Sequence, residues 1–206
     1  MMKLTYQSCW LSRCCTVVLL LFVAGCAGTT PARHYYGLSP LEQLAAEVAG
    51  VERSGIALGV GPVTIPDELK SPLIVTRPAA GRYQYSEFNR WAGLLENDLT
   101  RVLGVNLGLL LGTDRIGTYP WQSYFKPDYR IAVEVLRFDG DLSGEVILDA
   151  RWTIVDAGGT GILASGRSRF RQPVAAPAYE SLVRAESLAL AELSRTLADA
   201  IRHLQQ

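Results

Sequence analysis

The sequence predicts an α+β fold, a two-layer domain in which two long amphipathic helices cover an antiparallel or mixed sheet. Apolar residues recur at three- and four-residue steps in residues 86–111 and 179–204, as on one face of a helix. Between residues 129 and 171, three consecutive segments alternate apolar and polar side chains, which is the period of half-buried strands. Each apolar face needs a covering layer, so two packed layers are the economical arrangement.

Short β-prone segments, separated by glycine and proline residues that interrupt strands, precede the first helix. Gly61 and Pro62 end the first strand, and Pro72 and Pro78 bound the second, because proline removes a backbone donor. Pro66 and Pro72 also predict an irregular connection between the two strands. The predicted elements are a β-prone segment at His34–Leu38 and strands at Ile56–Val60 and Leu73–Thr76, with residues 40–54 unassigned.

The first long helix is predicted to begin at Ser86 as its N-cap and to run to about Leu111. Gly112 then provides the C-terminal stop. A short strand over Ile116–Tyr119 follows before Pro120. The apolar stripe consists of Phe88, Trp91, Leu95, Leu99, Val102, Leu103, Leu107 and Leu110.

The second half predicts an antiparallel meander followed by a helix. Strands begin near Tyr129, Val146 and Ile162, and the turns between them span residues 139–144 and 158–161. The last helix, Tyr179 to about Leu204, carries Glu180 with Arg184 and Glu192 with Arg195 on its polar side, spacings that support a helix.

The amino-terminal segment has the layout of a secretory signal ending in a lipidation site. Lys3 and Arg13 precede an apolar run of about eight residues, far short of the roughly 20 that span a bilayer. The quartet Val23-Ala24-Gly25-Cys26 closes that run and resembles the bacterial lipoprotein box, in which the cysteine is acylated and becomes the first mature residue. The domain plan is therefore a signal peptide (residues 1–25), a lipidated tether (26–33) and one domain (34–206).

Cleavage before Cys26 would remove the other three cysteines, leaving the folded domain without a thiol for a disulfide or a thiolate metal site. The mature chain would carry 18 basic and 20 acidic residues, a formal charge of −2, which gives no footprint for nucleic acid. Ala27, in place of an aspartate, implies sorting to the outer membrane in proteins with this type of box.

The inventory of reactive groups is small. His34 and His203 are the two histidines of the chain, and no G-x-S-x-G elbow accompanies them. His203 is explained by the dipole at a helix C-terminus. No calcium loop pattern occurs, and residues 158–161 form a turn between strands, unlike a phosphate-binding loop, which precedes a helix. We therefore predict no catalytic residue, no metal site and no cofactor.

Three features could form binding surfaces. A basic stripe is formed by Arg167, Arg169 and Arg171, and Asp149 on the preceding strand would neutralise part of it. The stripe could bind lipid headgroups or an acidic partner, or it could simply be a solvated face. Gly104, Gly108 and Gly112 lie on one side of the first helix, where either the domain's own sheet or a second protomer or partner helix approaches closely. The candidate partner surface consists of the aromatic residues Tyr83, Tyr85, Trp121, Tyr124 and Phe125, which could equally fill a core edge.

An ordered series of short strings, running from about Tyr35 to the last helix, resembles the ABC-type transport auxiliary lipoprotein family. The strings are Gly61-Pro62-Val63, Pro66, Leu69, Pro72, Ile74-Val75-Thr76-Arg77, Phe88-Asn89-Arg90-Trp91-Ala92, Asn106-Leu107, Tyr119-Pro120-Trp121 and Ala150-Arg151-Trp152. The resemblance implies a non-enzymatic outer-membrane lipoprotein that faces the periplasm. Its implied partners are an MCE-domain tunnel protein and an inner-membrane component, in lipid traffic and envelope integrity.

Three functions remain open from the sequence: a transport-accessory lipoprotein, a lipid carrier with its own apolar pocket, and an envelope hydrolase. The anchor at Cys26, the family strings and the small catalytic inventory favour the first.

Overall fold

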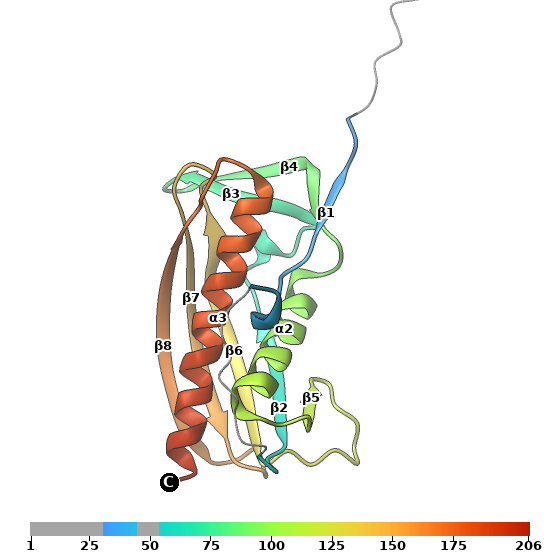
Figure 1. Cartoon of the computed structure of the whole chain (residues 1–206), viewed down its shortest axis with the longest axis vertical. Helices are drawn as coiled ribbons and strands as arrows, with labels where there is room; N and C mark the ends of the chain where they lie inside the picture. The colour runs from blue at the N-terminus through green and yellow to red at the C-terminus, as the bar shows by residue number, and fades with distance from the viewer. Residues whose placement is uncertain (1–30, 45–53) are drawn as a thin grey trace, which may run out of the picture. The chain divides into compact units, whose positions relative to one another are not determined.

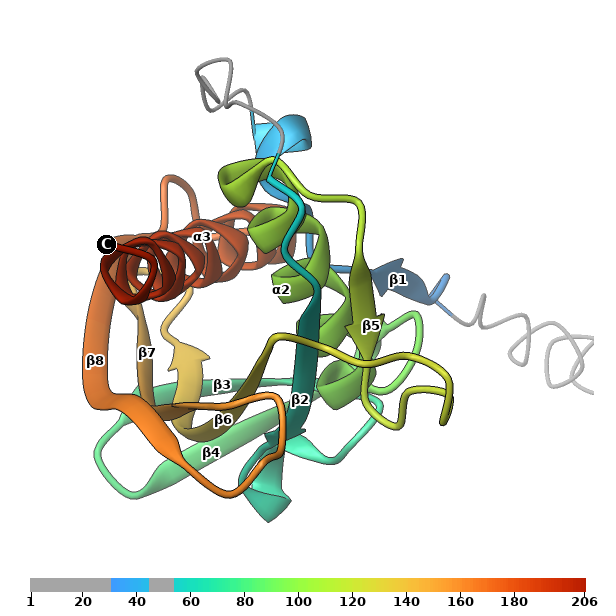
Figure 2. The same cartoon turned by 90° about the horizontal axis from the view of Figure 1, so that it is seen from below.

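The computed structural model describes residues 31–44 and 54–206, and within them eight strands form one mixed sheet that curves round two long helices (Figures 1 and 2). The α+β class predicted from the sequence is confirmed. Residues 33–206 form one unit. The strands are β1 (His34–Tyr36), β2 (Leu58–Thr64), β3 (Leu73–Ala79), β4 (Arg82–Trp91), β5 (Ile116–Thr118), β6 (Tyr129–Gly140), β7 (Glu145–Val155) and β8 (Ile162–Pro173).

The helices are α2 (Leu95–Leu111) and α3 (Tyr179–Leu204), with short 3-10 turns η2 (Leu41–Leu44) and η3 (Asp67–Leu69). Gly112 ends α2 in the left-handed conformation, as predicted, and its N–H bonds the Gly108 carbonyl. The bounds of α3 agree with the sequence prediction. The Arg195 and Glu192 pair forms at 2.8 Å, whereas Glu180 instead accepts the Tyr36 hydroxyl at 3.0 Å.

Strand β6 occupies the centre of the sheet. One of its edges pairs along its length with β7, and β8 pairs with β7, so the predicted antiparallel meander is confirmed. The other edge is shared in parallel by β2, from Tyr129 to Glu134, and by β3, at Gly140. The full order is β1-β4-β3-β6-β2-β5, with β7 and β8 beyond β6.

The core lies between the sheet and the helices. Alternate residues of the meander, such as Ile131, Leu148 and Ile154, point into it and are fully buried. Asn106 of α2 joins three elements, because its amide N–H bonds Ser194 of α3 at 3.0 Å and its carbonyl accepts the Leu41 N–H of η2 at 2.8 Å. Buried hydrogen bonds of this kind favour one packing of the two helices.

The predicted start of the first helix at Ser86 is wrong, because residues 82–91 form β4 and α2 begins at Leu95. Phe88 and Trp91 have helical spacing, but β4 pairs with β1 on one side and β3 on the other, and these distant ladders override the local pattern. Gly81, with φ of 71°, makes the turn that joins β3 to β4.

Two strand ends also differ from the prediction. Strand β2 continues through Gly61 and Pro62 to Thr64, with a register shift against β6 at that point, and β3 continues past Pro78 to Ala79. Proline is tolerated there because an irregularity removes the need for its donor. Residues 45–53 of the unassigned stretch lie outside the described residues, and Leu41–Leu44 is η2.

Glu186 of α3 is 1% exposed, and its Oε2 has no hydrogen-bond partner. Burial raises the pKa of its carboxyl well above the usual range, and the Asp139 carboxylate acts in the same direction. The folded state therefore holds this proton more tightly than the unfolded chain. Its stabilisation is complete below the unfolded pKa of about 4.5 and is lost as the pH rises.

We expect Glu186→Gln to match the parent near pH 4 and to be more stable at pH 7, by at least about 1 kcal/mol, since an uncharged amide carries no ionisation penalty. Urea unfolding at both pH values measures this difference. Glu192→Gln, which changes a half-exposed carboxylate of the same helix, is the matched control. A gain at pH 4 as large as that at pH 7 would contradict the role of ionisation.

Candidate functional site

The residues between β5 and β6 form an aromatic loop (residues 119–128) that lies on the sheet face opposite the helices. Three of its side chains each sit above a glycine of β2 or β5. A Cβ at Gly59 would lie 3.0 Å from the Trp121 ring, one at Gly61 would lie 2.7 Å from the Tyr119 Cβ, and one at Gly117 would overlap Phe125. The glycines therefore let the loop lie flat, and Trp121 and Phe125 are half-buried while Tyr124 is 82% exposed.

The aromatic loop and the turn between β7 and β8 enclose a hollow of about 550 Å³, here called the Arg130 hollow. The loop contributes Trp121, Phe125 and Lys126, the turn contributes Ala157 and Gly158, and Arg130 of β6 lies between them. The Arg130 guanidinium lies 5.7 Å from the centre of the Trp121 ring and donates to the Ala157 carbonyl at 2.6 Å. This hollow combines fixed aromatic walls with two cations.

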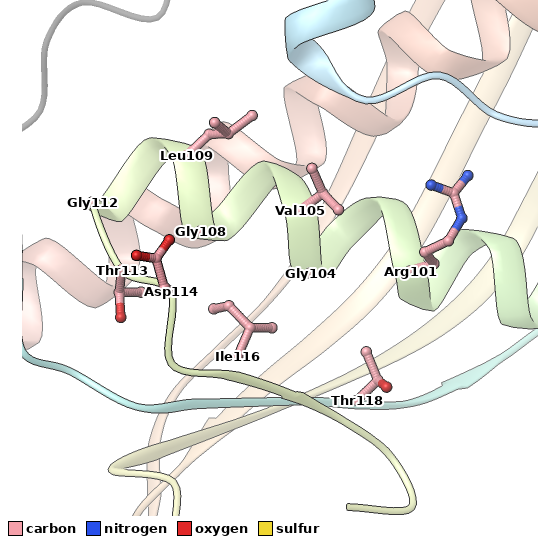
Figure 3. Close-up of a pocket in the computed structure, with 10 residues that line it drawn as sticks. All are labelled: Arg101, Gly104, Val105, Gly108, Leu109, Gly112, Thr113, Asp114, Ile116 and Thr118. Atoms are coloured by element: carbon pink, nitrogen blue, oxygen red, sulfur yellow. The ribbon is translucent and has the colours of Figure 1, made fainter.

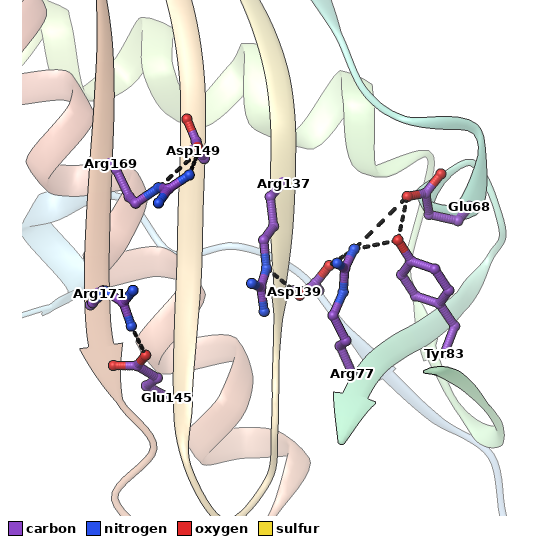
Figure 4. Close-up of polar contacts among 9 residues, drawn as sticks. All are labelled: Glu68, Arg77, Tyr83, Arg137, Asp139, Glu145, Asp149, Arg169 and Arg171. Carbon is purple, nitrogen blue, oxygen red and sulfur yellow. Dashed lines mark hydrogen bonds and ion pairs between the residues drawn. The ribbon is translucent and has the colours of Figure 1, made fainter. Parts of the chain in front are cut away.

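Tyr83 and Tyr85 lie elsewhere, on β4, at the end of the sheet remote from the aromatic loop (Figure 1). The Tyr83 hydroxyl donates to Glu68 at 2.7 Å and accepts from Arg77, whose guanidinium also lies 4.4 Å from the ring centre (Figure 4). The Glu68 bond raises the pKa of Tyr83. Tyr85 is 44% exposed. The five predicted partner-surface residues thus form two separate groups, and Tyr83 is engaged within its own domain.

The glycine face of α2 packs against the domain's own strand β5, which confirms one of the two interpretations left open by the sequence. A Cβ at Gly104 would meet Ile116 at 3.2 Å, and one at Gly108 would meet the Thr113 carbonyl at 3.0 Å. Beside this contact an open groove of about 580 Å³ runs along α2, with Val105, Leu109 and Ile116 as its apolar lining (Figure 3).

The open face of the sheet carries arginines held by buried carboxylates (Figure 4). Asp149 is 2% exposed and accepts Arg167 at 2.8 Å and Arg169 at 2.8 Å, so the predicted neutralisation of the basic stripe is confirmed. The Arg167 bonds, with those of Arg169, lower the pKa of Asp149 to about 2, against the effect of its burial. Arg171 pairs with Glu145.

The two histidines lie at opposite ends of α3. His34 is in β1, which meets the first turn of α3 through Tyr36 and Glu180, while His203 lies in the last turn, roughly 35 Å away at 1.5 Å per residue. Both are exposed, and His203 is placed as predicted. Within residues 31–44 and 54–206 no group of three His, Cys, Asp or Glu side chains is arranged to hold a metal ion.

Cys26 lies outside the described residues, so its lipidation stays a prediction. Among the helices that the structure describes, none is both long and apolar enough to span a bilayer. The sequence analysis did not identify Arg130, whose signal would have been a cation at the second position of a strand that directly follows an aromatic loop.

The described residues define the class of the domain as α+β, with one mixed sheet and two long helices. The chain belongs to the family described as the ABC-type transport auxiliary lipoprotein component, whose model it matches over residues 36–198. It is 27% identical over 137 residues to the intermembrane transport lipoprotein PqiC of Escherichia coli strain K12, covering 66% of this chain and 71% of that protein. The same figures hold for PqiC of Shigella flexneri.

The fold is also found among solved structures. The crystal structure of protein XCC0632 from Xanthomonas campestris superposes with a TM-score of 0.65 at 17% identity, covering 83% of this chain and 97% of that one. At this identity the likeness concerns the fold alone.

We expect Asp149→Asn to lower the free energy of unfolding at pH 7 by about 2 kcal/mol, because the lowered pKa of this carboxyl is a stabilisation of that order. The contribution is present above the unfolded pKa of 3.8 and is lost as the pH falls through about 2. Urea unfolding at pH 7 and pH 2 tests both points, and the variant and parent should converge at the lower pH.

The matched control is Arg151→Gln, which breaks an exposed pair with Glu134 at 3.2 Å and should change stability by less than about 1 kcal/mol. Equal effects of the two variants at pH 7 would show that burial of Asp149 is unimportant.

Proposed function

We propose that this protein is an outer-membrane lipoprotein and a non-enzymatic accessory component of an MCE-type intermembrane lipid transport system. The observation that carries the proposal is the family match over residues 36–198, which begins ten residues after the lipoprotein box at Cys26. The intermembrane transport named for the PqiC relatives supports the same role. The partners would be an MCE-domain tunnel protein and an inner-membrane component.

The physical role is that of a tethered receptor. The eight steps from Cys26 to His34 span at most roughly 28 Å of extended chain, which holds the end of the domain that carries β1 near the bilayer. A domain confined in this way meets the far end of a periplasmic tunnel at a high local concentration. The aromatic loop, at the end remote from β1 (Figure 1), would then be the part of the candidate surface that faces such a partner.

A lipid carrier is a second candidate, favoured by the apolar groove beside α2 and by Arg101 among its lining residues (Figure 3). Native mass spectrometry of the purified chain would reveal bound phospholipid in that case.

We expect Cys26→Ser to move the protein from the membrane fraction to the soluble fraction, because the acyl chains supply the attachment. Cys14→Ser, within the predicted signal peptide, is the control and should leave the protein in the membrane. Ala27→Asp should retain it in the inner membrane on a sucrose gradient. Membrane attachment of the Cys26→Ser protein would exclude the anchor.

Tyr124→Ala should weaken co-purification with the MCE tunnel protein roughly fivefold, the effect of losing about 1 kcal/mol from an exposed aromatic contact. Tyr35→Ala, which removes a 61% exposed tyrosine on β1, should not change it. Quantitative pull-down from detergent-solubilised envelope measures both. If no tunnel protein co-purifies with the parent chain, the proposed function itself is excluded.

A further inference from the structure

The two cations of the Arg130 hollow differ from the other arginines of β6, β7 and β8 in their ion pairing. The other arginines of β6, β7 and β8 (Arg137, Arg151, Arg167, Arg169 and Arg171) each pair with a carboxylate. Among residues 31–44 and 54–206, neither Arg130 nor Lys126 has a carboxylate within 4.0 Å. A guanidinium that makes no ion pair within 4.0 Å can bind an additional anion.

The nearest acidic groups are already used by the backbone. Asp156 opens the turn beside the hollow and accepts the Thr160 N–H at 3.0 Å. Its interactions with the backbone of Thr160 and Gly161 lower the pKa of its carboxyl, and the charge of Arg130 acts in the same direction without forming an ion pair within 4.0 Å. Asp128 accepts the Ala57 N–H at 2.7 Å. Among the described residues that line the hollow there is no acidic side chain, so two positive charges face it.

Arg130 is held in place by its surroundings. The Trp121 ring lies on one side of the guanidinium, and a Cβ at Gly159 would overlap its Nη1 on another. Its Nε is buried without a hydrogen-bond partner, while Nη2 is bonded to Ala157. A side chain fixed in this way loses little further freedom when it binds a ligand.

We propose that the Arg130 hollow binds a carboxylate-bearing segment of a periplasmic partner protein. The inference rests on the proposed function, since it specifies the chemistry by which the aromatic loop recognises its partner. The Nη1 end of the Arg130 guanidinium has no hydrogen bond among the described residues and can donate to a carboxylate, since Nε is buried and Nη2 already donates to Ala157. Lys126 adds a second charge at the rim, and Trp121 and Phe125 provide apolar walls.

Two observations favour a peptide over a lipid surface. Arg130 is recessed between the loop and the turn, where a protruding side chain or chain end can enter and a flat layer of headgroups cannot. The hollow also lies at the opposite end of α3 from β1, and 26 helical residues extend about 39 Å. The hollow therefore lies at the end of the domain remote from β1.

The test measures binding of a dye-labelled, capped tetraglutamate peptide to the purified lipidated chain in neutral detergent, by fluorescence anisotropy. We expect saturable binding that weakens with added salt, and none for capped tetraglutamine. Lys126→Glu should weaken binding at least about tenfold, whereas Lys70→Glu, the same charge change on an exposed lysine after η3, should not. Arg130→Gln should abolish binding. Because Arg130 is partly packed in the fold, the Lys126→Glu variant is the safer test, since Lys126 is exposed and its replacement does not disturb that packing.

Three binding results would each overturn the proposal: no saturable binding of tetraglutamate, an equal loss in the two lysine variants, or displacement of the peptide by phosphatidylglycerol but not by phosphatidylcholine, each added to the detergent micelles. The last result would assign the hollow to anionic lipid. Co-purification of the tunnel protein with Lys126→Glu at the parental level would also exclude the hollow as the docking site while leaving the accessory function intact.

Discussion

The shared edge of β6 is the constraint on which the rest of the structure depends. One strand of twelve residues has β2 beside its first half and β3 beside its last residue, so the chain between them, with η3, must leave the sheet. The β3–β4 hairpin and β1 are thereby placed at one end of the sheet, and β5 with the aromatic loop at the other (Figure 1). The two ends of the sheet therefore carry different chemistry.

The open face of the sheet shows how one layer of helices suffices for eight described strands. Burying Asp139 and Asp149 would be unfavourable for isolated charges, but each accepts two arginines, Arg77 and Arg137 in one case and Arg167 and Arg169 in the other. The stems of these arginines cover the sheet while their charged ends reach water. Each of these arginines lies within 4.0 Å of a carboxylate, whereas Arg130 has none at that distance among residues 31–44 and 54–206.

Local patterns determined what the sequence could predict. The alternation of apolar and polar residues predicts the strands of the meander, and an apolar stripe predicts the start and end of α3. Both patterns can be read from residues that are close in the sequence. Strand β4 could not be recognised in this way, because its ladder to β1 joins Asn89 to His34, 55 positions earlier in the chain. The same limit applies to the site. The residues next to Tyr83 in the sequence do not indicate its contacts, because Glu68 and Arg77 reach it only in the folded sheet. Trp121 similarly lies beside Arg130 only because β2 pairs in parallel with both β5 and β6.

Three glycines connect the fold to the proposed recognition. Gly59, Gly61 and Gly117 have no side chains to hold the aromatic loop away from β2 and β5, so the loop is ordered before any partner arrives. Preorganisation removes an entropic penalty that a flexible loop would incur on binding, about 0.5–1.5 kcal/mol for each side chain immobilised. In the proposed function, the tether adds to this advantage, since it keeps the domain attached to the membrane and raises the effective concentration of partner. In the proposed function, the hollow could therefore act in a transport assembly without high intrinsic affinity and release its partner when the assembly comes apart.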